Sequence, residues 1–570
     1  MRRGRGAALL SKCYNWVAKR DLDMSTFLLS FLFLLAPPPQ QTPTPNPADL
    51  CTIQGVVVKA GTGEPLHKAT VNARPEVSRP GKDEPQGGAA ETDAMGRFEI
   101  KDLAPGRYYL SAQRNGFVRL QYGQRTPEGQ GAILTLSSGQ KVPDITFQMI
   151  PAAVISGHVY DEDGEPVLYV QVMAMRYAYM DGQRQLVPDG AGQTNDLGEF
   201  RLFGLSPGQY IVQAILRYNR FENTKTKQSY VPVYYPGVPD ASRATPITVR
   251  GGDEFSGVDI SLQPARGLTV KGNVINAGCG ATSQGTMVFL HEQNSNQNAG
   301  WLNVNRPANA QGSFEFSNVV PGSYYLIAMR NEEGKQCLGR QALEVTDADI
   351  DGVPLTVSPG VEIKGHVRIE GQSEPNVGSL TVFLAPKTTS IPFYGGAGGH
   401  IEPDGSFLLK NAFDGDYEIQ VGNLLDNYFV KSARLDGVDV LTAGVTVDTK
   451  HDSGSLEIVV SPNGASVDGV IFKDQQPFQG ATVALVPDPP HRGEKRLFKS
   501  VTTDQNGHFV LQGLSPGDYK VFAWEKIESG AYTSSEFLLP YEKLGESVHI
   551  TEGSRNSVQL DLIAAKDSNP

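Results

Sequence analysis

Beyond residue 36, apolar and polar residues alternate with a period of two in many short runs, and helical periodicity is almost absent. A period of two places one face of a β-strand against a core and the other face in solvent. One set of runs begins at a tyrosine: Tyr108–Ala112, Tyr210–Ala214, Tyr324–Ala328, Tyr417–Val421 and Tyr519–Ala523. A second set lies further along: Ile145–Met149, Val258–Leu262, Val353–Val357, Leu456–Val460 and Val558–Leu562. The pattern predicts an all-β chain of short strands.

A turn of common form precedes each tyrosine run. Its first copy is Asp93-Ala-Met-Gly-Arg-Phe98, and the phenylalanines of the five copies lie at positions 98, 200, 314, 407 and 509. Asp or Asn can accept hydrogen bonds from its own turn and glycine supplies a positive φ, so the motif predicts a tight turn followed by a strand with an inward Phe. A Pro-Gly pair then precedes the tyrosine in four copies, and Asp414-Gly415 takes its place in the fourth copy. We expect this glycine in the left-handed position of a type II turn.

The repeat has the length of a domain. The phenylalanines are spaced by 93 to 114 residues, which is much longer than a solenoid repeat. A glycine interrupts the strand that begins each copy and indicates a bulge or a close backbone approach, at Gly55, Gly157, Gly272, Gly365 and Gly469. We predict five tandem seven-stranded antiparallel β-sandwich domains, at residues 51–150, 151–265, 266–359, 360–462 and 463–565.

The segment before these domains predicts export. The apolar run Ser25–Ala36 has 12 residues, too few for a membrane-spanning helix of about 20, and it follows Lys19 and Arg20. We interpret residues 1–36 as a signal segment and residues 37–50 as a Pro-rich linker, although the leader is long and lacks an A-x-A cleavage pattern. A short buried helix and a start at Met24 are alternatives. The expected location is the periplasm, the outer surface or the medium, with no transmembrane segment beyond the signal.

The repeat resembles the carboxypeptidase regulatory-like domain. The resemblance rests on the order of a G-x-V strand, a second strand such as Ala69-Thr-Val-Asn-Ala, then D-x-x-G-x-F and L-x-P-G-x-Y, and it covers nearly all of residues 51–565. It implies an Ig-like or transthyretin-like sandwich, similar to Cna-B modules, used as an accessory, binding or stalk module in extracellular bacterial proteins. Related folds are classed with starch-binding-like domains, so the resemblance also implies carbohydrate binding.

Composition and charge exclude several classes of protein. The 62 glycines and 38 prolines fit a turn-rich folded chain, and four cysteines are too few for a disulfide-built scaffold. The net charge is −12 and no basic run lies on a predicted strand, so nucleic acid is not an expected partner.

No set of residues supports an enzyme, and no cofactor or metal is expected. The sequence His491-Arg-Gly-Glu494 has the spacing of a zinc carboxypeptidase motif, but it lies in a Pro-rich loop without a catalytic domain around it. Asp347-x-Asp349-x-Asp351-Gly352 matches the first half of a calcium loop, yet the position that needs a bidentate Glu is Ser358. An acidic turn between strands is the preferred interpretation.

Two further sets of residues carry expectations. Cys279 and Cys337 both fall in predicted loops of the third domain, and in an oxidising compartment we expect them to form a disulfide bond. The second domain has an insertion in which Tyr230, Tyr234 and Tyr235 could form a flat surface that stacks on sugar rings. The alternative is that these tyrosines cover the end of the sandwich or a neighbouring domain.

The leading hypothesis is a non-enzymatic exported protein whose β-sandwiches serve adhesion, binding or structural support. Its partner would be a polysaccharide or a cell-surface protein. The alternatives are an array of carbohydrate-binding modules and an accessory subunit of a separate hydrolase.

Overall fold

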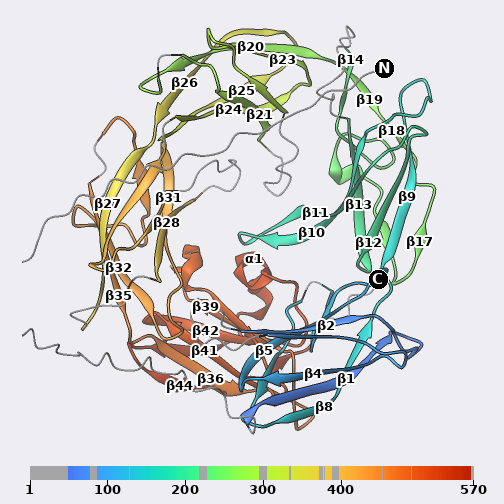
Figure 1. Cartoon of the computed structure of the whole chain (residues 1–570), viewed down its shortest axis with the longest axis vertical. Helices are drawn as coiled ribbons and strands as arrows, with labels where there is room; N and C mark the ends of the chain where they lie inside the picture. The colour runs from blue at the N-terminus through green and yellow to red at the C-terminus, as the bar shows by residue number, and fades with distance from the viewer. Residues whose placement is uncertain are drawn as a thin grey trace, which may run out of the picture. The chain divides into compact units, whose positions relative to one another are not determined.

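The computed structural model describes residues 49–565 except 77–86, 128, 217–227, 281, 294–303, 333–334, 372–376, 378, 388–396, 452–453 and 490. The predicted signal segment and most of the linker therefore lie outside the described residues. The described residues form β-strands, one α-helix of four residues, α1 (Ser535–Leu538), and short 3₁₀ helices at Ala241–Arg243, His491–Gly493, Lys495–Leu497, Ala531–Thr533 and Leu539–Tyr541. No helix among them is long and apolar enough to cross a membrane. The structure confirms an all-β chain of tandem β-sandwiches (Figure 1).

Five clusters of buried apolar side chains follow one another along the chain. Their members fall within residues 51–149, 153–262, 268–357, 363–460 and 465–560. We call these ranges the first to fifth units. The domain boundaries proposed from the sequence fall in the gaps between the clusters.

The first unit contains β1 (Cys51–Lys59), β2 (Thr70–Pro75), β3 (Gly88–Glu91), β4 (Arg97–Leu103), β5 (Gly106–Gln113), β6 (Leu120–Gln121), β7 (Ile133–Leu136) and β8 (Lys141–Met149). They form two sheets with the orders β4-β1-β8 and β3-β2-β5-β6, and β7 pairs with β5. The core lies between the sheets and includes Ile53, Phe98 and Phe147, each at most 5% exposed.

The second unit contains β9 (Ala153–Tyr160), β10 (Gln171–Met180), β11 (Gln183–Gln193), β12 (Glu199–Leu205), β13 (Gly208–Ile215), β14 (Gln228–Val231), β15 (Val233–Tyr234), β16 (Ile247–Val249), β17 (Glu254–Phe255), β18 (Ile260–Ser261) and β19 (Gln263–Arg266). β12, β9 and β17 form one sheet, with β18 also paired to β9, and the second sheet has the order β11-β10-β13-β15 with β16 paired to β13. The β10–β11 hairpin is long, and the strand that contains Tyr230, β14, pairs with β19 instead of joining either sheet.

The third unit contains β20 (Leu268–Asn276), β21 (Met287–Glu292), β22 (Val304–Pro307), β23 (Ser313–Val319), β24 (Gly322–Glu332), β25 (Lys335–Val345) and β26 (Ile350–Pro359). Here β25 pairs with both β24 and β26, so all seven strands form one continuous sheet, β22-β21-β24-β25-β26-β20-β23.

The fourth unit contains β27 (Val361–Ile369), β28 (Thr381–Pro386), β29 (Gly398–His400), β30 (Ser406–Ala412), β31 (Gly415–Gly422), β32 (Phe429–Leu435), β33 (Val438–Asp439), β34 (Val445–Val447) and β35 (Ser455–Ser461). Its two sheets have the orders β30-β27-β35-β32-β33 and β29-β28-β31-β34.

The fifth unit contains β36 (Ala465–Val470), β37 (Phe472–Lys473), β38 (Gln476–Pro477), β39 (Thr482–Pro487), β40 (Lys499–Thr502), β41 (His508–Leu514), β42 (Gly517–Trp524), β43 (Glu546–Ile550), β44 (Arg555–Ser557) and β45 (Leu562–Ile563). Its main sheets have the orders β41-β36-β44 and β40-β39-β42-β43, with β45 paired to β42, and β37 pairs with β38. The 3₁₀ helices His491–Gly493 and Lys495–Leu497 lie between β39 and β40, and α1 lies with the 3₁₀ helices Ala531–Thr533 and Leu539–Tyr541 between β42 and β43.

One feature corrects the prediction of purely antiparallel sheets. In every unit the first strand pairs in parallel with a strand near the unit's end: β1 with β8, β9 with β17 and β18, β20 with β26, β27 with β35, and β36 with β44. Alternation predicts which face of a strand is buried, but it carries no information about the direction of a neighbour.

The glycine of each first strand confirms the predicted close approach. A Cβ atom at Gly55 would lie 2.0 Å from the carbonyl oxygen of Ile145 on the parallel strand β8. A Cβ atom at Gly365 would lie 2.1 Å from the ring of Phe407 and 2.6 Å from the carbonyl oxygen of Leu456. Glycine therefore lets the first strand fit between its parallel neighbour and the Phe of the repeated turn.

Hydrogen bonds stabilise the repeated turn and hold the tyrosine side chain in place in the five units. Asp93 Oδ1 accepts hydrogen bonds from the backbone N–H groups of Met95 and Arg97, at 2.8 and 2.9 Å. Each tyrosine hydroxyl donates to the carbonyl four residues earlier, over 2.8 to 3.0 Å: Tyr108 to Ala104, Tyr210 to Ser206, Tyr324 to Val320, Tyr417 to Phe413 and Tyr519 to Ser515. These bonds satisfy buried polar groups at the same place in each unit.

The prediction of a type II turn at Pro-Gly is wrong. Gly106 and Gly517 have φ values of 154° and 153°, far from the value near +80° that a type II turn requires, and each is the first residue of a strand. A Cβ atom at Gly517 would lie 3.2 Å from the ring of Tyr519. The glycine therefore leaves room for the ring whose hydroxyl closes the turn.

Candidate functional site

The three tyrosines of the second unit are half-buried, and they occupy different surroundings. Tyr230 in β14 donates a hydrogen bond to Glu162 Oε2 over 2.8 Å. Tyr234 in β15 accepts a hydrogen bond from Gln213 Nε2 over 3.1 Å, and burial raises the pKa of its hydroxyl. Tyr235 packs, like Tyr230, against the core of the second unit, whereas Tyr234 packs against a separate apolar cluster. The structure therefore does not place the three rings on one common face.

Tyr230 lines a small cleft between the second and third units. The opposite wall includes Arg306, Asn318 and Tyr324, and Ser229 Oγ donates to the carbonyl of Asn318 over 3.0 Å. The cleft has a volume of about 110 Å³, below the roughly 300 Å³ at which ligand sites begin. Its small volume fits a contact between units better than a site for a sugar ring.

The structure joins Cys279 and Cys337 in a disulfide bond within the third core. Their Cα atoms lie 6.3 Å apart, and both side chains are at most 3% exposed. Cys279 follows β20, but Cys337 belongs to β25, so the expected loop position is wrong for Cys337. Cys51 is buried as a free thiol whose Sγ lies 3.0 Å from the carbonyl oxygen of Ser137.

The carboxylates that resemble metal motifs bind protein groups. Asp349 Oδ1 accepts from the backbone N–H of Thr269 over 2.9 Å, and Asp351 Oδ1 accepts from its neighbour's N–H. His491 Nδ1 lies 2.6 Å from Glu494 Oε1, and the same carboxylate contacts Arg496. Within the described ranges, no group of three His, Cys, Asp or Glu side chains has a geometry that could hold a metal ion.

A groove of about 320 Å³ lies between the fourth and fifth units, with charged and aromatic side chains on its walls. Lys431 forms ion pairs with Glu370 at 2.6 Å and Glu552 at 2.9 Å, and the hydrogen bond to Glu370 raises the pKa of the lysine. Tyr519, which also lines the groove, has its pKa raised to about 12 by burial. At neutral pH the hydroxyl of Tyr519 is therefore neutral and the ammonium of Lys431 is ion-paired, so neither group is prepared to act as a general base.

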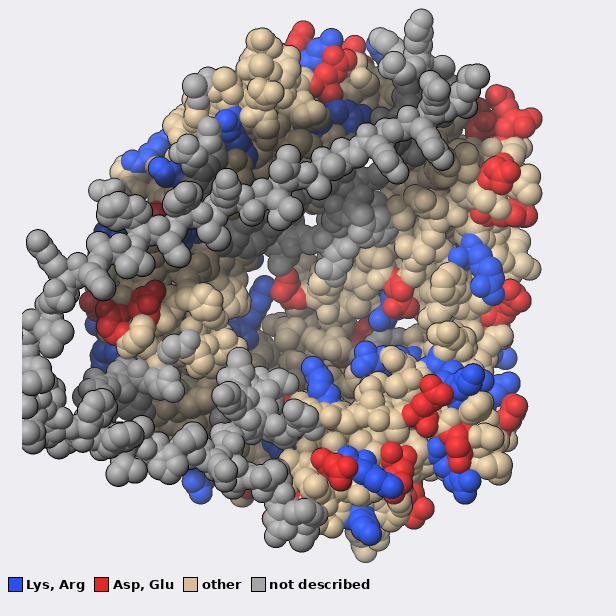
Figure 2. Space-filling view, in the orientation of Figure 1, with Lys and Arg blue, Asp and Glu red and all other residues tan. Residues whose placement is uncertain are grey.

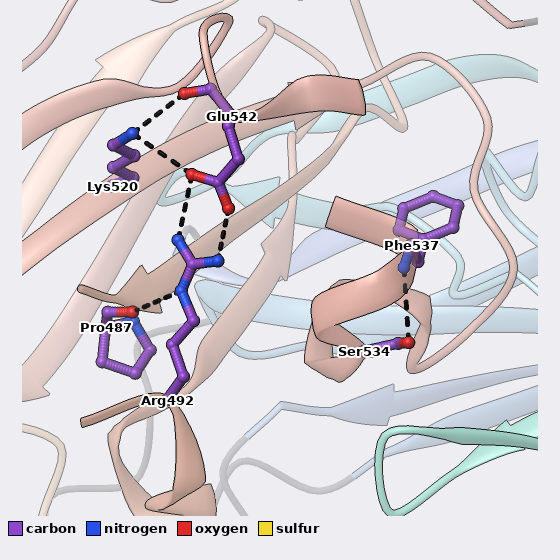
Figure 3. Close-up of polar contacts among 6 residues, drawn as sticks. All are labelled: Pro487, Arg492, Lys520, Ser534, Phe537 and Glu542. Atoms are coloured by element: carbon purple, nitrogen blue, oxygen red, sulfur yellow. Dashed lines mark hydrogen bonds and ion pairs between the residues drawn. The ribbon is translucent and has the colours of Figure 1, made fainter. Parts of the chain in front are cut away.

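A cluster of polar contacts in the fifth unit was missed by sequence reasoning (Figure 3). Arg492 binds both carboxylate oxygens of Glu542, with Nη2–Oε2 at 3.0 Å, and its Nε donates to the carbonyl of Pro487 over 3.3 Å. Lys520 Nζ donates to the backbone carbonyl and to Oε2 of Glu542, over 2.9 and 3.2 Å. The hydrogen bond from Arg492 is the largest cause of the lowered pKa of Glu542. The bidentate pair fastens the 3₁₀ segment after β39 to the segment before β43.

Beside this cluster, an aromatic group covers the outer face of β42. Phe522 stacks on Trp524 with ring centroids 5.2 Å apart, and Trp524 meets Tyr541 edge to face at 5.9 Å. Ser534 Oγ caps α1 by accepting from the backbone N–H of Phe537 over 3.4 Å (Figure 3). The signal in the sequence is the aromatic-rich stretch at 532–541, which lies between the tyrosine strand and the last strands of the fifth repeat, where the second repeat has its tyrosine insertion.

The fifth unit also contacts units that do not precede it directly. Tyr179, near the end of the β10–β11 hairpin, lies edge-on to Phe537 at 5.8 Å, and Lys495 Nζ lies 2.8 Å from Asp181 Oδ1 in the same hairpin. From the first unit, the carbonyl oxygen of Gly131 accepts a buried hydrogen bond from Thr502 Oγ1 over 2.7 Å. Residue pairs more than 300 positions apart in sequence thus lie in contact.

Charge is dispersed over the surface. On the face drawn in Figure 2, acidic and basic side chains are interspersed, so the net charge of −12 does not gather in one acidic region there. Many of the exposed charges are ion-paired within a unit, as Arg97 is with Asp93 at 3.0 Å and Lys101 with Glu99 at 2.7 Å.

Comparisons with known proteins give one domain match and several distant similarities. Serine-aspartate repeat-containing protein D of Staphylococcus aureus strain Newman is 24% identical over 167 residues, which are 27% of this chain and 12% of that protein. The chain therefore matches only a small part of this curated relative. GBS52, the minor pilin of Streptococcus agalactiae, is 14% identical with a TM-score of 0.22, covering 37% of this chain and 94% of that one. The Bacillus anthracis TIE protein is 11% identical with a TM-score of 0.15, covering 74% and 76%. Residues 52–149, which include all of β1 to β8 except Cys51, match the carboxypeptidase regulatory-like domain, the family that the repeated motifs indicate.

Proposed function

We propose that this chain is a non-enzymatic exported scaffold that binds a polysaccharide or a cell-surface protein through the loops of its β-sandwich units. The observation that carries the proposal is the contrast between a constant framework and variable attachments. All five units share the tyrosine hydroxyl bond and the close-approach glycine, whereas the second carries the β14 insertion and the fifth carries the helical one. Rigid sheets with differing end loops are the usual arrangement of binding scaffolds.

The charged groups support a binding role over catalysis. The carboxylates at the motif-like positions, Glu494, Asp349 and Asp351, accept bonds from protein groups. In the groove between the fourth and fifth units, Lys431 is held by two carboxylates. Groups neutralised in this way position loops and contribute to recognition, but they offer no activated nucleophile.

Two measurements test the proposal. Fractionation of the producing cells, with determination of the mature N-terminal residue, should place the protein outside the cytoplasm with the segment 1–36 removed. The purified mature chain should retain a ligand on a glycan array or on intact cells of the producing species. A cytoplasmic protein with an intact leader, or hydrolysis of a polysaccharide by the purified chain alone, would contradict it.

The tyrosine insertion gives the polysaccharide alternative a test of its own. Because Tyr234 and Tyr235 are half-buried, alanine at both positions should lower the melting temperature of the second unit. The same change removes the rings that would stack on a sugar. Phenylalanine at both positions keeps the rings and serves as the matched variant. If the rings stack on sugars, the phenylalanine variant should retain the glycan and the alanine variant should not. Equal retention by both variants would show that these residues do not belong to the binding surface.

A further inference from the structure

The first unit contains an open groove whose charged lining is entirely basic. The groove has a volume of about 640 Å³ and lies where the chain enters β2 and leaves β5. His67 and Lys68 line one side, and Arg114 and Arg119 line the other. Among the described residues, the rest of its lining is polar or aromatic and includes no Asp or Glu.

Several other cations of the first unit are ion-paired, unlike the basic groups of this groove. Arg97, Lys101 and Arg107 each form an ion pair, with Asp93, Glu99 and Glu76 respectively. Across the described parts of the chain, neither Arg114 nor Arg119 nor Lys68 is ion-paired to a carboxylate.

Their own contacts hold these side chains without neutralising them. The guanidinium of Arg114 lies over the ring of Phe117, 5.2 Å from its centroid, and Arg119 Nη2 donates to Ser111 Oγ over 3.2 Å. The groove is therefore a region of positive potential on a chain of net charge −12.

Arg114, one of the groove's cations, is replaced by an uncharged or acidic residue in three of the other four units. Arg114 lies six residues after the repeat tyrosine, and the residues at that offset in the following units are Leu216, Arg330, Asn423 and Glu525. Arg330 does not reproduce the groove, since it is 9% exposed in its own unit.

Lys68 has a left-handed backbone with φ 58°, at a turn position where the third and fifth units have glycine, with φ 85° at Gly285 and 76° at Gly480. A side chain in this conformation is strained, so the first unit keeps a lysine where glycine would be less strained.

We propose that this groove binds an acidic polysaccharide, with the guanidinium groups of Arg114 and Arg119 on sugar carboxylates. The inference rests on the proposed binding function and names a ligand class for it. Arginine forks match carboxylate geometry, and the side-chain amides of Gln113 and Asn115 with the hydroxyl of Thr70 supply donors and acceptors for sugar hydroxyls. The volume lies within the usual range for ligand sites.

The lining favours a sugar chain over a membrane surface. A membrane-docking face combines cations with exposed large apolar side chains that enter the lipid. Among the described residues of the first unit, Met95 is the most exposed large apolar side chain, and it lies outside the groove. The groove's aromatic residue, Phe117, is half-buried beneath Arg114. A hydrated polyanion fits such a lining.

The test uses the full mature chain and isothermal titration with polygalacturonate oligomers, with neutral dextran as the comparison ligand. The variant Arg114→Gln/Arg119→Gln removes two groove charges. The matched control, Lys59→Gln/Lys141→Gln, removes two charges from the same unit outside the groove. Melting temperatures of both variants check that the first unit remains folded.

We expect polygalacturonate to bind, dextran not to bind, and binding to weaken when NaCl rises from about 50 to about 300 mM. The groove variant should lose about tenfold in affinity, and the control should stay within about twofold. Equal losses in both variants would show diffuse attraction and overturn the proposal. Tighter binding of anionic lipid vesicles or of polyglutamate, with the same dependence on Arg114 and Arg119, would also overturn it in favour of a membrane or an acidic protein.

The same experiments separate this inference from the function it rests on. If the chain retains another glycan or binds intact cells but ignores polygalacturonate, the groove assignment fails and the binding scaffold stands. If the chain binds no ligand on the array, on cells or in titration, both fail.

Discussion

Replacing Gly365 with alanine should unfold the fourth unit at a much lower temperature. Gly365 lies opposite Phe407 on one side and Leu456 on the other in the sheet register, so an added methyl group meets both neighbours. Its Cβ would lie 2.1 Å from the Phe407 ring and 2.6 Å from the Leu456 carbonyl oxygen. The ring is 5% exposed and the Leu456 side chain is fully buried, so neither can move into open space.

The magnitude follows from these distances. Restoring ordinary contact requires displacements of roughly 1 Å in a core packed as densely as a crystal, and overpacking of this kind costs about 1–3 kcal/mol. Because one of the two close contacts is to a backbone carbonyl, we expect Gly365→Ala to lower the free energy of unfolding by about 3 kcal/mol, the upper end of this range. For a unit of this size the corresponding loss in melting temperature is about 10–20 °C.

Differential scanning calorimetry of the full chain is the appropriate assay, because a chain of several domains shows more than one transition. Gly398→Ala is the matched control in the same unit: its Cβ would meet its nearest neighbour only at 3.9 Å. We expect the control to change the free energy of unfolding of the fourth unit by no more than about 0.5–1 kcal/mol. Equal shifts for the two variants would refute the close-approach explanation of the repeated glycine.

Three further predictions concern a turn, a disulfide bond and a tyrosine of the framework. Hydrogen bonds from its own turn lower the pKa of Asp93, so its stabilisation is present above the unfolded pKa near 4 and is lost as pH falls through the folded pKa. The melting temperature of Asp93→Asn should therefore lie below the wild type at pH 7 and converge with it in acid; a gap that is independent of pH would contradict this. Intact mass should rise by two hydrogens on reduction as the bond between Cys279 and Cys337 opens, and replacing both with serine should cost about 4 kcal/mol for a separation of 58 residues; an unchanged mass would remove the disulfide. Tyr519→Phe loses the bond to Ser515 and should cost about 1 kcal/mol. Because the pKa of Tyr519 is raised to about 12, the wild type should also lose stability as pH rises from about 10 towards 12, and the phenylalanine variant should lack that loss.

The sequence was sufficient to predict the parts of the fold that local chemistry determines. Asp93 and Gly96 form a turn because of their own backbone preferences, and Phe98 and Tyr108 face inward because of the period of two. Such features depend on residues close together along the chain. They could therefore be predicted without any knowledge of neighbouring strands.

Features that depend on distant residues could not be predicted. The pairing of β1 with β8 joins residues about 90 positions apart, and alternation is the same for parallel and antiparallel neighbours. The sequence predicts a loop at Cys337, but β25 extends along β24 and takes the cysteine into the sheet. The sequence does not predict the basic groove, because Lys68 and Arg114 are far apart along the chain and each is an ordinary surface residue until the strands bring them together.

The parallel pairing of first and last strands has a mechanical consequence. Where β1 lies beside β8 over the register from Thr52–Lys141 to Lys59–Met149, a pull on the two ends of the unit slides one strand along the other. The interstrand hydrogen bonds then carry the load together, in shear, instead of opening one after another from an end. Each such unit is therefore built to resist tension applied between its two ends.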